Sequence, residues 1–244
     1  TVTALATGLA IPRQTLVLPN GDILVAEGSG GGAPALRPKD VIATYIKAMG
    51  KSSVKGGNRV TLLRDADNDG RAELRTSFIT GLNAPYGLAY VDGQIYVADQ
   101  DALVRFPYRE GVTRITSPGV ELLKLPSHIN HHWTKSLTAG PDGSRLYVGI
   151  GSNSNVGERG MGVEQDRAVI WEIDRQSGMH RTYASGIRNP TALAIEPRTQ
   201  RLWAVVNERD ELGPQLVPDY LTSVRPGAFY GWPYSYWGQN VDDR

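Results

Sequence analysis

Short hydrophobic runs recur along the chain, and turn-forming residues separate them. The runs at 23–26, 95–98, 146–149 and 202–206 each follow a turn rich in Pro, Gly, Asp or Asn, at 19–22, 92–93, 141–143 and 197–199 respectively. A second β-rich run precedes each turn. Two such runs joined by a short turn predict a β-hairpin, so the chain contains four similar hairpins.

Further strand candidates lie between the hairpins, at 60–63, 102–106 and 168–173. A unit of roughly 50 to 70 residues with about four strands is typical of a β-propeller blade. The pattern therefore predicts an all-β fold of the six-bladed propeller type, with about four blades in a single domain over 1–244. One Gly-rich insertion, 28–57, interrupts the pattern, and the spacing of its apolar residues predicts a helix over 38–49.

Polar residues stand where the second strand of a hairpin ends. Glu27 and Asp99 occupy this place in the first two copies, and Asn207 and Glu208 occupy it in the fourth. Equivalent strand ends of a propeller lie at one face around its axis, so these side chains are expected to converge. Asp and Asn are also common turn formers, which is the structural alternative.

Composition narrows the classes of function. The 244 residues are 40% hydrophobic and 21% charged, with a formal net charge of +1, which gives no electrostatic reason to expect a nucleic acid as partner. No run approaches the roughly 20 apolar residues that span a bilayer. Without cysteine, a disulfide, a thiolate nucleophile and a Cys-ligated metal are excluded.

Three of the four histidines lie within five positions, at His128, His131 and His132. They precede an apolar run and the turn 140–143, where a loop enters a strand. Histidine serves as general base or metal ligand near neutral pH, and loops on a β scaffold commonly carry such sites. A solvated loop histidine is the alternative.

Two other motifs favour structure over function. The stretch 65–70 reads D-A-D-N-D-G, as in the first half of a calcium loop, but position twelve of that loop is Thr76, so we interpret it as a charged hairpin turn. The Gly-rich stretch 149–155 lacks the spacing of a dinucleotide site and is interpreted as a polar loop near a site.

Three later stretches carry candidate chemistry. Arg188 and Asn189 precede the fourth hairpin in the same topological place as the histidines before the third, and arginine suits the binding of an anion or a developing oxyanion. The charge run 207–213 offers oxygen ligands for a hard cation such as calcium. Six aromatic residues within 229–237 supply core packing and a stacking wall for a planar cofactor or a sugar.

In order along the chain, these motifs resemble the quinoprotein glucose/sorbosone dehydrogenases, and most closely the L-sorbosone dehydrogenase-like branch. The pieces are L-P-N-G-D-I-L-V-A-E at 18–27, N-H-H-W at 130–133 with G-P-D-G at 140–143, G-I-R-N-P at 186–190, N-E-R-D-E-L-G at 207–213, P-D-Y-L-T-S-V at 218–224 and F-Y-G-W-P-Y-S-Y at 229–236. The resemblance implies a six-bladed propeller that uses pyrroloquinoline quinone (PQQ) and calcium to oxidise a sugar aldehyde or hemiacetal.

The resemblance also implies roles for residues. His132 matches the general base, and Arg188 would stabilise charge on the quinone oxygen. The backbone carbonyls of Asp210 and Glu211 would bind calcium. The implied cofactor-binding set is His131, Arg188, Asn189, Glu208, Arg209, Tyr230 and Trp232. The implied partners are a sugar and an external electron acceptor, and the implied location is periplasmic or secreted.

About four of the six expected blades are present, so we expect this chain to be part of a longer protein or to be completed by a companion chain. Two alternatives remain open. One is a calcium-dependent lactonase-type propeller hydrolase, with its metal on side chains such as Glu27 and Asp99. The other is a binding propeller without catalysis. The sugar and the physiological acceptor are not specified by the sequence.

Overall fold

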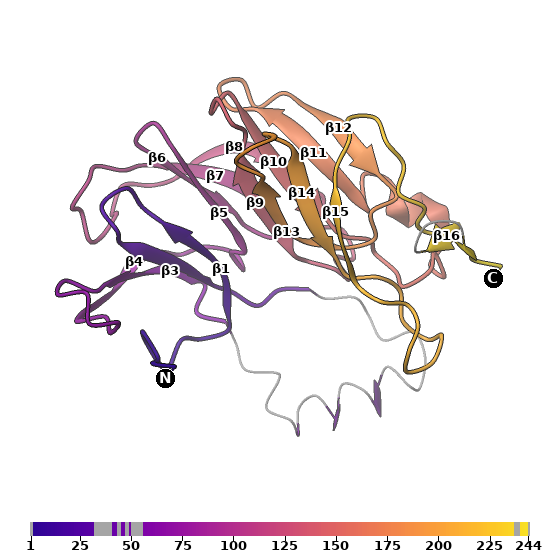
Figure 1. The fold of residues 1–244 in the computed structure, drawn as a ribbon, viewed down its shortest axis with the longest axis horizontal. Helices are drawn as coiled ribbons and strands as arrows, with labels where there is room; N and C mark the ends of the chain where they lie inside the picture. The colour runs from indigo at the N-terminus through magenta and orange to yellow at the C-terminus, as the bar shows by residue number, and fades with distance from the viewer. Residues whose placement is uncertain are drawn as a thin grey trace.

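The computed structural model describes residues 2–31, 41–42, 45–46, 49, 56–236 and 240–243. Nearly all regular structure in these ranges is β-strand, and all but the last two strands form four successive antiparallel sheets that fan out in chain order (Figure 1). The predicted β-propeller arrangement of about four blades is confirmed. The predicted helix over 38–49 lies mostly outside the described residues, as does much of the insertion 28–57.

The first three blades each contain four strands, paired in sequence order. Blade 1 consists of β1 (Pro12–Val17), β2 (Ile23–Glu27), β3 (Arg59–Arg64) and β4 (Leu74–Thr80). Blade 2 consists of β5 (Gly87–Val91), β6 (Gln94–Ala98), β7 (Ala102–Pro107) and β8 (Val120–Lys124). Blade 3 consists of β9 (Lys135–Ala139), β10 (Arg145–Ile150), β11 (Val169–Asp174) and β12 (His180–Ser185), with the short 3₁₀ helix η1 (Met161–Glu164) between β10 and β11.

Blade 4 has three strands among the described residues, namely β13 (Pro190–Ile195), β14 (Leu202–Val206) and β15 (Tyr220–Ser223). A two-stranded sheet of β16 (Ser235–Tyr236) and β17 (Asn240–Val241) follows it. All four predicted hairpins and the three further strands are therefore found, each within a few residues of its expected bounds. No helix in the described ranges is long and apolar enough to cross a membrane.

The hydrophobic core lies between blades. Three clusters of buried side chains fill the interfaces of blades 1 and 2, blades 2 and 3, and blades 3 and 4. Strand β10 shows how the sequence produces this. Its Leu146, Val148 and Ile150 face the blade 2 side, whereas Tyr147 between them faces blade 4. Because side chains alternate along a strand, a blade buried on both faces reads as a continuous apolar run.

The innermost strands β1, β5, β9 and β13 contact one another in that order. Gly87 of β5 permits the approach to β9, because a Cβ there would lie 2.4 Å from the carbonyl oxygen of Lys135. Gly149 of β10 likewise permits the approach to β13, because a Cβ there would lie 2.8 Å from the carbonyl oxygen of Pro190. Gln14 of β1 ties three of these strands together. Its Nε2 donates to the carbonyls of Leu88 (2.8 Å) and Leu137 (2.9 Å), and its Oε1 accepts from the Leu137 N–H (3.3 Å).

Candidate functional site

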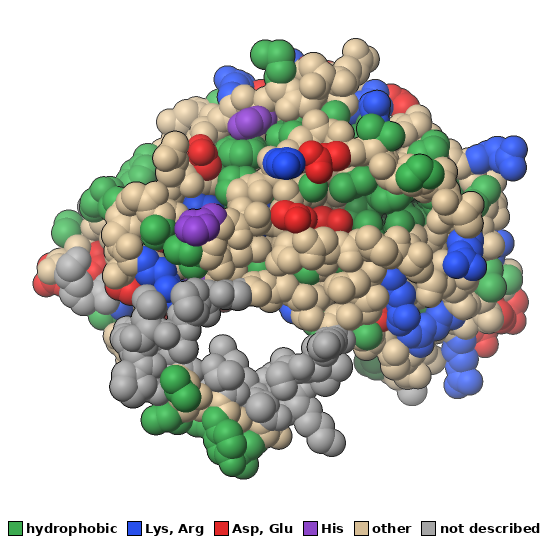
Figure 2. Space-filling view, turned by 180° about the vertical axis from the view of Figure 1, so that it is seen from behind, with side chains coloured by type: hydrophobic (Ala, Val, Ile, Leu, Met, Phe, Trp, Pro, Cys, Tyr) green, Lys and Arg blue, Asp and Glu red, His purple; other side chains and the backbone are tan. Residues whose placement is uncertain are grey.

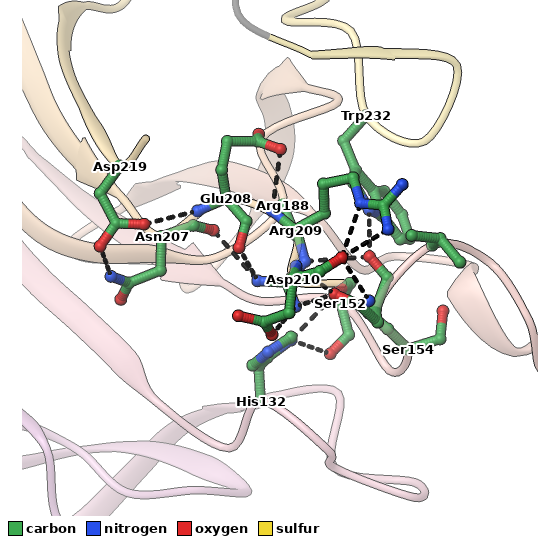
Figure 3. A network of polar contacts seen from close by, with 12 residues as sticks. His132, Ser152, Ser154, Arg188, Asn207, Glu208, Arg209, Asp210, Asp219 and Trp232 are labelled. Carbon is green, nitrogen blue, oxygen red and sulfur yellow. Dashed lines mark hydrogen bonds and ion pairs between the residues drawn. The ribbon is translucent and has the colours of Figure 1, made fainter. Parts of the chain in front are cut away.

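His132 is held at the entry to β9 by two attachments to Ser152, which follows β10 (Figure 3). The backbone N–H of His132 donates to the Ser152 carbonyl (3.2 Å), and its ring Nδ1 lies 2.9 Å from both that carbonyl and the Ser152 hydroxyl. A carbonyl can only accept, and the hydroxyl already donates to the Ser154 carbonyl (2.6 Å). Nδ1 therefore carries the proton, which leaves the Nε2 lone pair available as a base.

The surroundings keep this imidazole neutral. Burial lowers the pKa of His132 well below its ordinary value, and the charge of Arg188 and the neighbouring His131 lower it further. The two histidine rings meet edge to face with centroids 4.6 Å apart. His131 itself is exposed, and its backbone N–H donates to the side chain of Asn153 (3.4 Å). A neutral imidazole with a free Nε2 is the form that a general base requires.

Arg188 is a fixed cation beside this base, and only 2% of its surface is exposed. Its Nε donates to the Asn155 carbonyl (3.0 Å), and its Nη1 donates to the carbonyls of Glu208 (2.6 Å) and Asn207 (3.3 Å). Its Nη2 donates to the Asn155 side chain (2.7 Å) and, more weakly, to the Asp210 carboxylate (3.4 Å). The first four contacts fix the guanidinium, and the fifth faces a side chain that is 81% exposed.

Asn155 joins these elements, and the sequence reasoning did not single it out. Its Oδ1 accepts from Arg188 and from the Asp210 N–H (2.9 Å), while its Nδ2 donates to the Asp210 carbonyl (3.2 Å). Its own carbonyl accepts from the indole N–H of Trp232 (2.9 Å). The repeat carried a usable signal, because the polar run 152–155 follows the third hairpin as Asp99 and Asn207 follow the second and fourth.

Gly151 allows His132 and Asn189 to approach each other. A Cβ at this position would lie 2.4 Å from the Asn189 Oδ1 and 2.6 Å from the His132 Cβ. Asn189 is 7% exposed, and its Oδ1 accepts from the Thr134 hydroxyl (3.0 Å). The predicted residues His132, Arg188 and Asn189 are thus brought together.

The segment after β14 carries the predicted metal ligands. Glu208 and Arg209 are buried, and burial raises the pKa of Glu208. The Asp210 carbonyl accepts from Arg209 Nε (2.9 Å) and Nη2 as well as from Asn155. Arg209 also forms a buried ion pair with Asp242 (3.1 Å). This carbonyl is therefore occupied by a guanidinium in the place where calcium was expected, whereas the side chains of Asp210 and Glu211 are exposed.

The aromatic residues divide into two groups. Trp232 is 4% exposed and supports the network through the hydrogen bond from its indole N–H to the Asn155 carbonyl. Tyr230 belongs to the end of blade 4, where its hydroxyl donates to the Ser223 carbonyl (2.8 Å) and accepts from the Arg225 N–H (2.9 Å). Tyr230 also lines a separate pocket of about 460 Å³ beside β15. Trp232 therefore does not present a ring face as a stacking wall.

Glu27, Asp99 and Glu208 do not form a common cluster of metal ligands in the described part of the chain. Glu27 accepts from Arg59 (3.0 Å), Thr61 and the Ala10 N–H within blade 1. Asp99 accepts from the Asn83 N–H (3.0 Å), and its other oxygen is buried without a partner. One group of potential metal ligands is found in the described part of the chain, with one ligand atom from each residue and all of these atoms within 4.8 Å of one another. It consists of Asp65, Asp67, Asp69 and Glu73. Strand ends can share a face while their side chains are satisfied within their own blades.

The group at Asp65 is the turn between β3 and β4. Its carboxylates accept backbone N–H groups of the same turn, including Asp69 N–H to Asp65 (3.2 Å) and Ala66 N–H to Glu73 (2.7 Å). This arrangement fits the charged hairpin turn that the sequence predicts. Figure 2 shows a different concentration of charge, with acidic, basic and histidine side chains gathered toward the middle of one face.

The order of the blades and the polar network at one end of them define a β-propeller with a candidate site between blades 3 and 4. The chain belongs to the TrAA12-like family, whose family model matches residues 1–227. Among curated proteins, none matches the chain.

Solved structures with the same fold include three carbohydrate-active proteins. The PQQ domain of Coprinopsis cinerea pyranose dehydrogenase, in its holo form, is 17% identical with a TM-score of 0.71, over 94% of this chain and 56% of that one. A calcium structure of the Trichoderma reesei family AA12 enzyme is 19% identical with a TM-score of 0.69, over 96% and 60%. The PQQ-bound aldose sugar dehydrogenase of Streptomyces coelicolor is 20% identical with a TM-score of 0.68, over 99% and 68%. The chain spans less than two thirds of the first two.

Proposed function

We propose that this protein takes part in the PQQ-dependent oxidation of a sugar at its aldehyde or hemiacetal carbon. The observation that carries the proposal is the paired arrangement of His132 and Arg188. A neutral imidazole with its Nε2 available lies beside a buried fixed cation, in a family whose structural neighbours include PQQ-bound sugar dehydrogenases. A general base and a charge stabiliser are what the protein must supply for this chemistry.

Each residue has a defined task in this proposal. Nε2 of His132 accepts the proton of the sugar hydroxyl, which allows the carbon–oxygen double bond to form as the C–H bond breaks. Arg188 supplies positive charge where negative charge develops. Because its four inward contacts are fixed, the guanidinium is preorganised and needs no reorganisation during the reaction. PQQ, when bound, supplies the two-electron oxidant that accepts the hydride.

The residues fit an anionic planar cofactor at one point in particular. The outward contact of Arg188 is the 3.4 Å pair with the exposed carboxylate of Asp210. An anionic oxygen of PQQ can replace that carboxylate without breaking the four buried contacts. His131, Asn189, Glu208 and Arg209 complete the proposed cofactor surroundings, together with Trp232 and, at the blade 4 end, Tyr230.

Calcium fits less well in the form that the resemblance implied. The Asp210 carbonyl cannot bind a cation while Arg209 donates to it, so we derive no step from the metal. The exposed carboxylates of Asp210 and Glu211 are oxygen donors of the kind that calcium prefers. We propose these side chains, rather than the paired carbonyls, as the calcium ligands of this chain.

The remaining parts of the proposal concern the whole protein. We propose an external electron acceptor, a periplasmic or secreted location and a single propeller domain over 1–244. A companion chain that supplies the other blades remains a prediction, which an intact-mass measurement of the purified protein checks.

Calorimetric titration of PQQ into the protein with calcium present tests the proposal, followed by dye-linked oxidation of aldoses. We expect binding, and we expect His132→Ala to lower kcat by about 10²- to 10⁴-fold with binding retained. His128→Ala is the matched control, because His128 is an exposed residue of the same loop, and it should leave turnover unchanged.

Other outcomes have separate meanings. Tight binding without oxidation of any aldose would indicate a binding propeller. Lactone hydrolysis without an electron acceptor would indicate the hydrolase, although its expected metal ligands Glu27 and Asp99 are engaged separately. Absence of binding by a preparation shown to contain all blades would contradict the quinoprotein assignment.

A further inference from the structure

Lys135 is a completely buried ammonium group three residues after His132. It is the first residue of β9 and has 0% of its surface exposed. Its Nζ donates to the side-chain oxygen of Asn130 (3.1 Å) and to the carbonyl of Trp133 (3.1 Å). An ammonium group without water is costly unless its hydrogen bonds replace hydration, so this position carries a structural demand.

A second buried cation converges on the same acceptor. Arg167, 4% exposed, comes from the residues just before β11. Its Nη1 donates to the Asn130 side-chain oxygen (3.2 Å) and to the carbonyl of Pro126 (2.7 Å). Its Nη2 donates to the carbonyl of His132 (2.9 Å). One amide oxygen therefore accepts from two cations.

Neither cation is neutralised by a direct ion pair in the described ranges. Asp101 and Glu164 act on Lys135 and Arg167 only through longer-range attraction. Burial is the main reason that the pKa of Lys135 lies well below its ordinary value, and the charge of Arg167 adds to this effect. A pair that repels itself and lacks a counterion is not explained as a stabilising salt bridge.

The oxygen atoms that accept hydrogen bonds from Lys135 and Arg167 indicate why these two side chains are buried together. Pro126, Asn130, His132 and Trp133 all belong to the segment 126–133, which carries the candidate base. Within it, Ile129 (φ 63°) and Asn130 (φ 55°) adopt the left-handed region, which is unfavourable for a β-branched residue such as isoleucine. Such a backbone persists only where its surroundings fix it. The two cations are those surroundings.

We propose that Lys135 and Arg167 are positioning residues that fix the 126–133 backbone and thereby aim Nε2 of His132 at the substrate. This rests on the proposed role of His132 as base. Arg167 holds the His132 carbonyl while Ser152 holds its backbone N–H and ring Nδ1. Release of the carbonyl lets the peptide rotate and separates Nδ1 from the Ser152 carbonyl, which removes the reason for the Nδ1-protonated tautomer.

The test replaces Lys135 by methionine, which keeps most of the side-chain volume and removes the charge and donors. Nitrogen-15 NMR of the four histidines reports which ring nitrogen of His132 is protonated in the protein without cofactor. Lys124→Met is the matched control, because Lys124 ends β8 on the neighbouring blade with an exposed side chain. Arg167→Lys is a second variant that keeps the cation and loses the fork reaching Pro126 and His132.

We expect wild type and Lys124→Met to show the Nδ1-protonated tautomer of His132, and both Lys135→Met and Arg167→Lys to shift it toward the Nε2-protonated form. In the protein loaded with PQQ and calcium, kcat should fall about 10- to 100-fold with KM changed less than about threefold, because misplacement of a base affects turnover more than binding. Arg167→Lys supplies the answer if Lys135→Met does not fold.

Two results would overturn the proposal. One is an unchanged His132 tautomer in a folded variant, and the other is an equal fall of kcat in Lys124→Met. If the tautomer shifts as expected but the wild-type protein oxidises no sugar, positioning stands and the proposed function fails.

Discussion

Blades 1 and 2 and blades 3 and 4 use the same strand ends in different ways. Glu27 and Asp99 end the second strands of blades 1 and 2, and each is satisfied by groups of its own blade or left partly unsatisfied. After β10, the Asn155 side chain instead meets Arg188, which precedes β13, across the interface between blades 3 and 4, while the backbone carbonyl of Glu208 accepts from Arg188 within blade 4. A place at the end of a blade's second strand is therefore enough to bury a polar residue. To form a site between blades, that residue also needs a partner from the neighbouring blade.

The strongest test of this comparison is Asn155→Ala. The change leaves a guanidinium donor of Arg188 and the Asp210 N–H unpaired in a buried place, so the free energy of unfolding should fall by about 2–4 kcal/mol. Chemical denaturation measures the loss, and the enzyme assay should show a parallel loss of activity. Asn83→Ala, which removes side-chain hydrogen bonds from an exposed residue of blade 2, should cost no more than about 1 kcal/mol. If the two variants lost the same free energy of unfolding, the polar network between blades 3 and 4 would contribute no more than the side-chain contacts of blade 2.

Asp99→Asn should raise the free energy of unfolding, whereas Asn155→Ala should lower it. Burial raises the pKa of Asp99 to about 7, above its unfolded value of 3.8. Below about pH 4, Asp99 is protonated in both the folded and the unfolded state, so it does not lower the free energy of unfolding. As the pH rises from 4 toward 7, the unfolded state ionises first, and the free energy of unfolding falls. The amide removes the ionisation, so the variant should be more stable than wild type by roughly 1–3 kcal/mol at pH 8 and nearly equal at pH 4. Thermal unfolding at the two pH values measures this, and a loss of stability at pH 8 would contradict the buried-acid interpretation.

Glu27→Gln is expected to have the smallest effect. Burial alone would raise the pKa of Glu27, but hydrogen bonds from Arg59, Thr61 and Ala10 outweigh it and lower the pKa. Its stabilising contribution is therefore present above its ordinary pKa and is lost as pH falls. Because Arg59 is 31% exposed, the cost should be about 1 kcal/mol at pH 7 and smaller at pH 3. An increase in stability would contradict this interpretation and show that the Glu27 carboxylate, like that of Asp99, destabilises the folded protein.

The fold was predictable because its information is local. The hydrophobic runs, the turn residues and the repeat identify strands and blades without knowledge of any distant contact. The site was predictable in part. The repeat gives the His132 loop and Arg188 equivalent places before two successive hairpins, and the structure brings them together.

The rest of the site depends on contacts between residues far apart in the sequence. Asn155 meets Trp232 across 77 residues and Arg188 across 33, and no local pattern specifies those pairs. Lys135 gave no signal either, because a lysine at the start of a strand is usually solvated. Its burial follows from the packing of blade 3 against its neighbours.

The Gln14 side chain at the axis has a consequence for the order of folding. Its partners Leu88 and Leu137 lie 74 and 123 residues away. These hydrogen bonds cannot form until the inner strands of three blades have come together. Closing such long loops lowers the chain entropy before the new contacts stabilise the structure. We therefore expect blade 1 to make its axial hydrogen bonds late in folding, at a rate set more by chain topology than by the strength of any one contact.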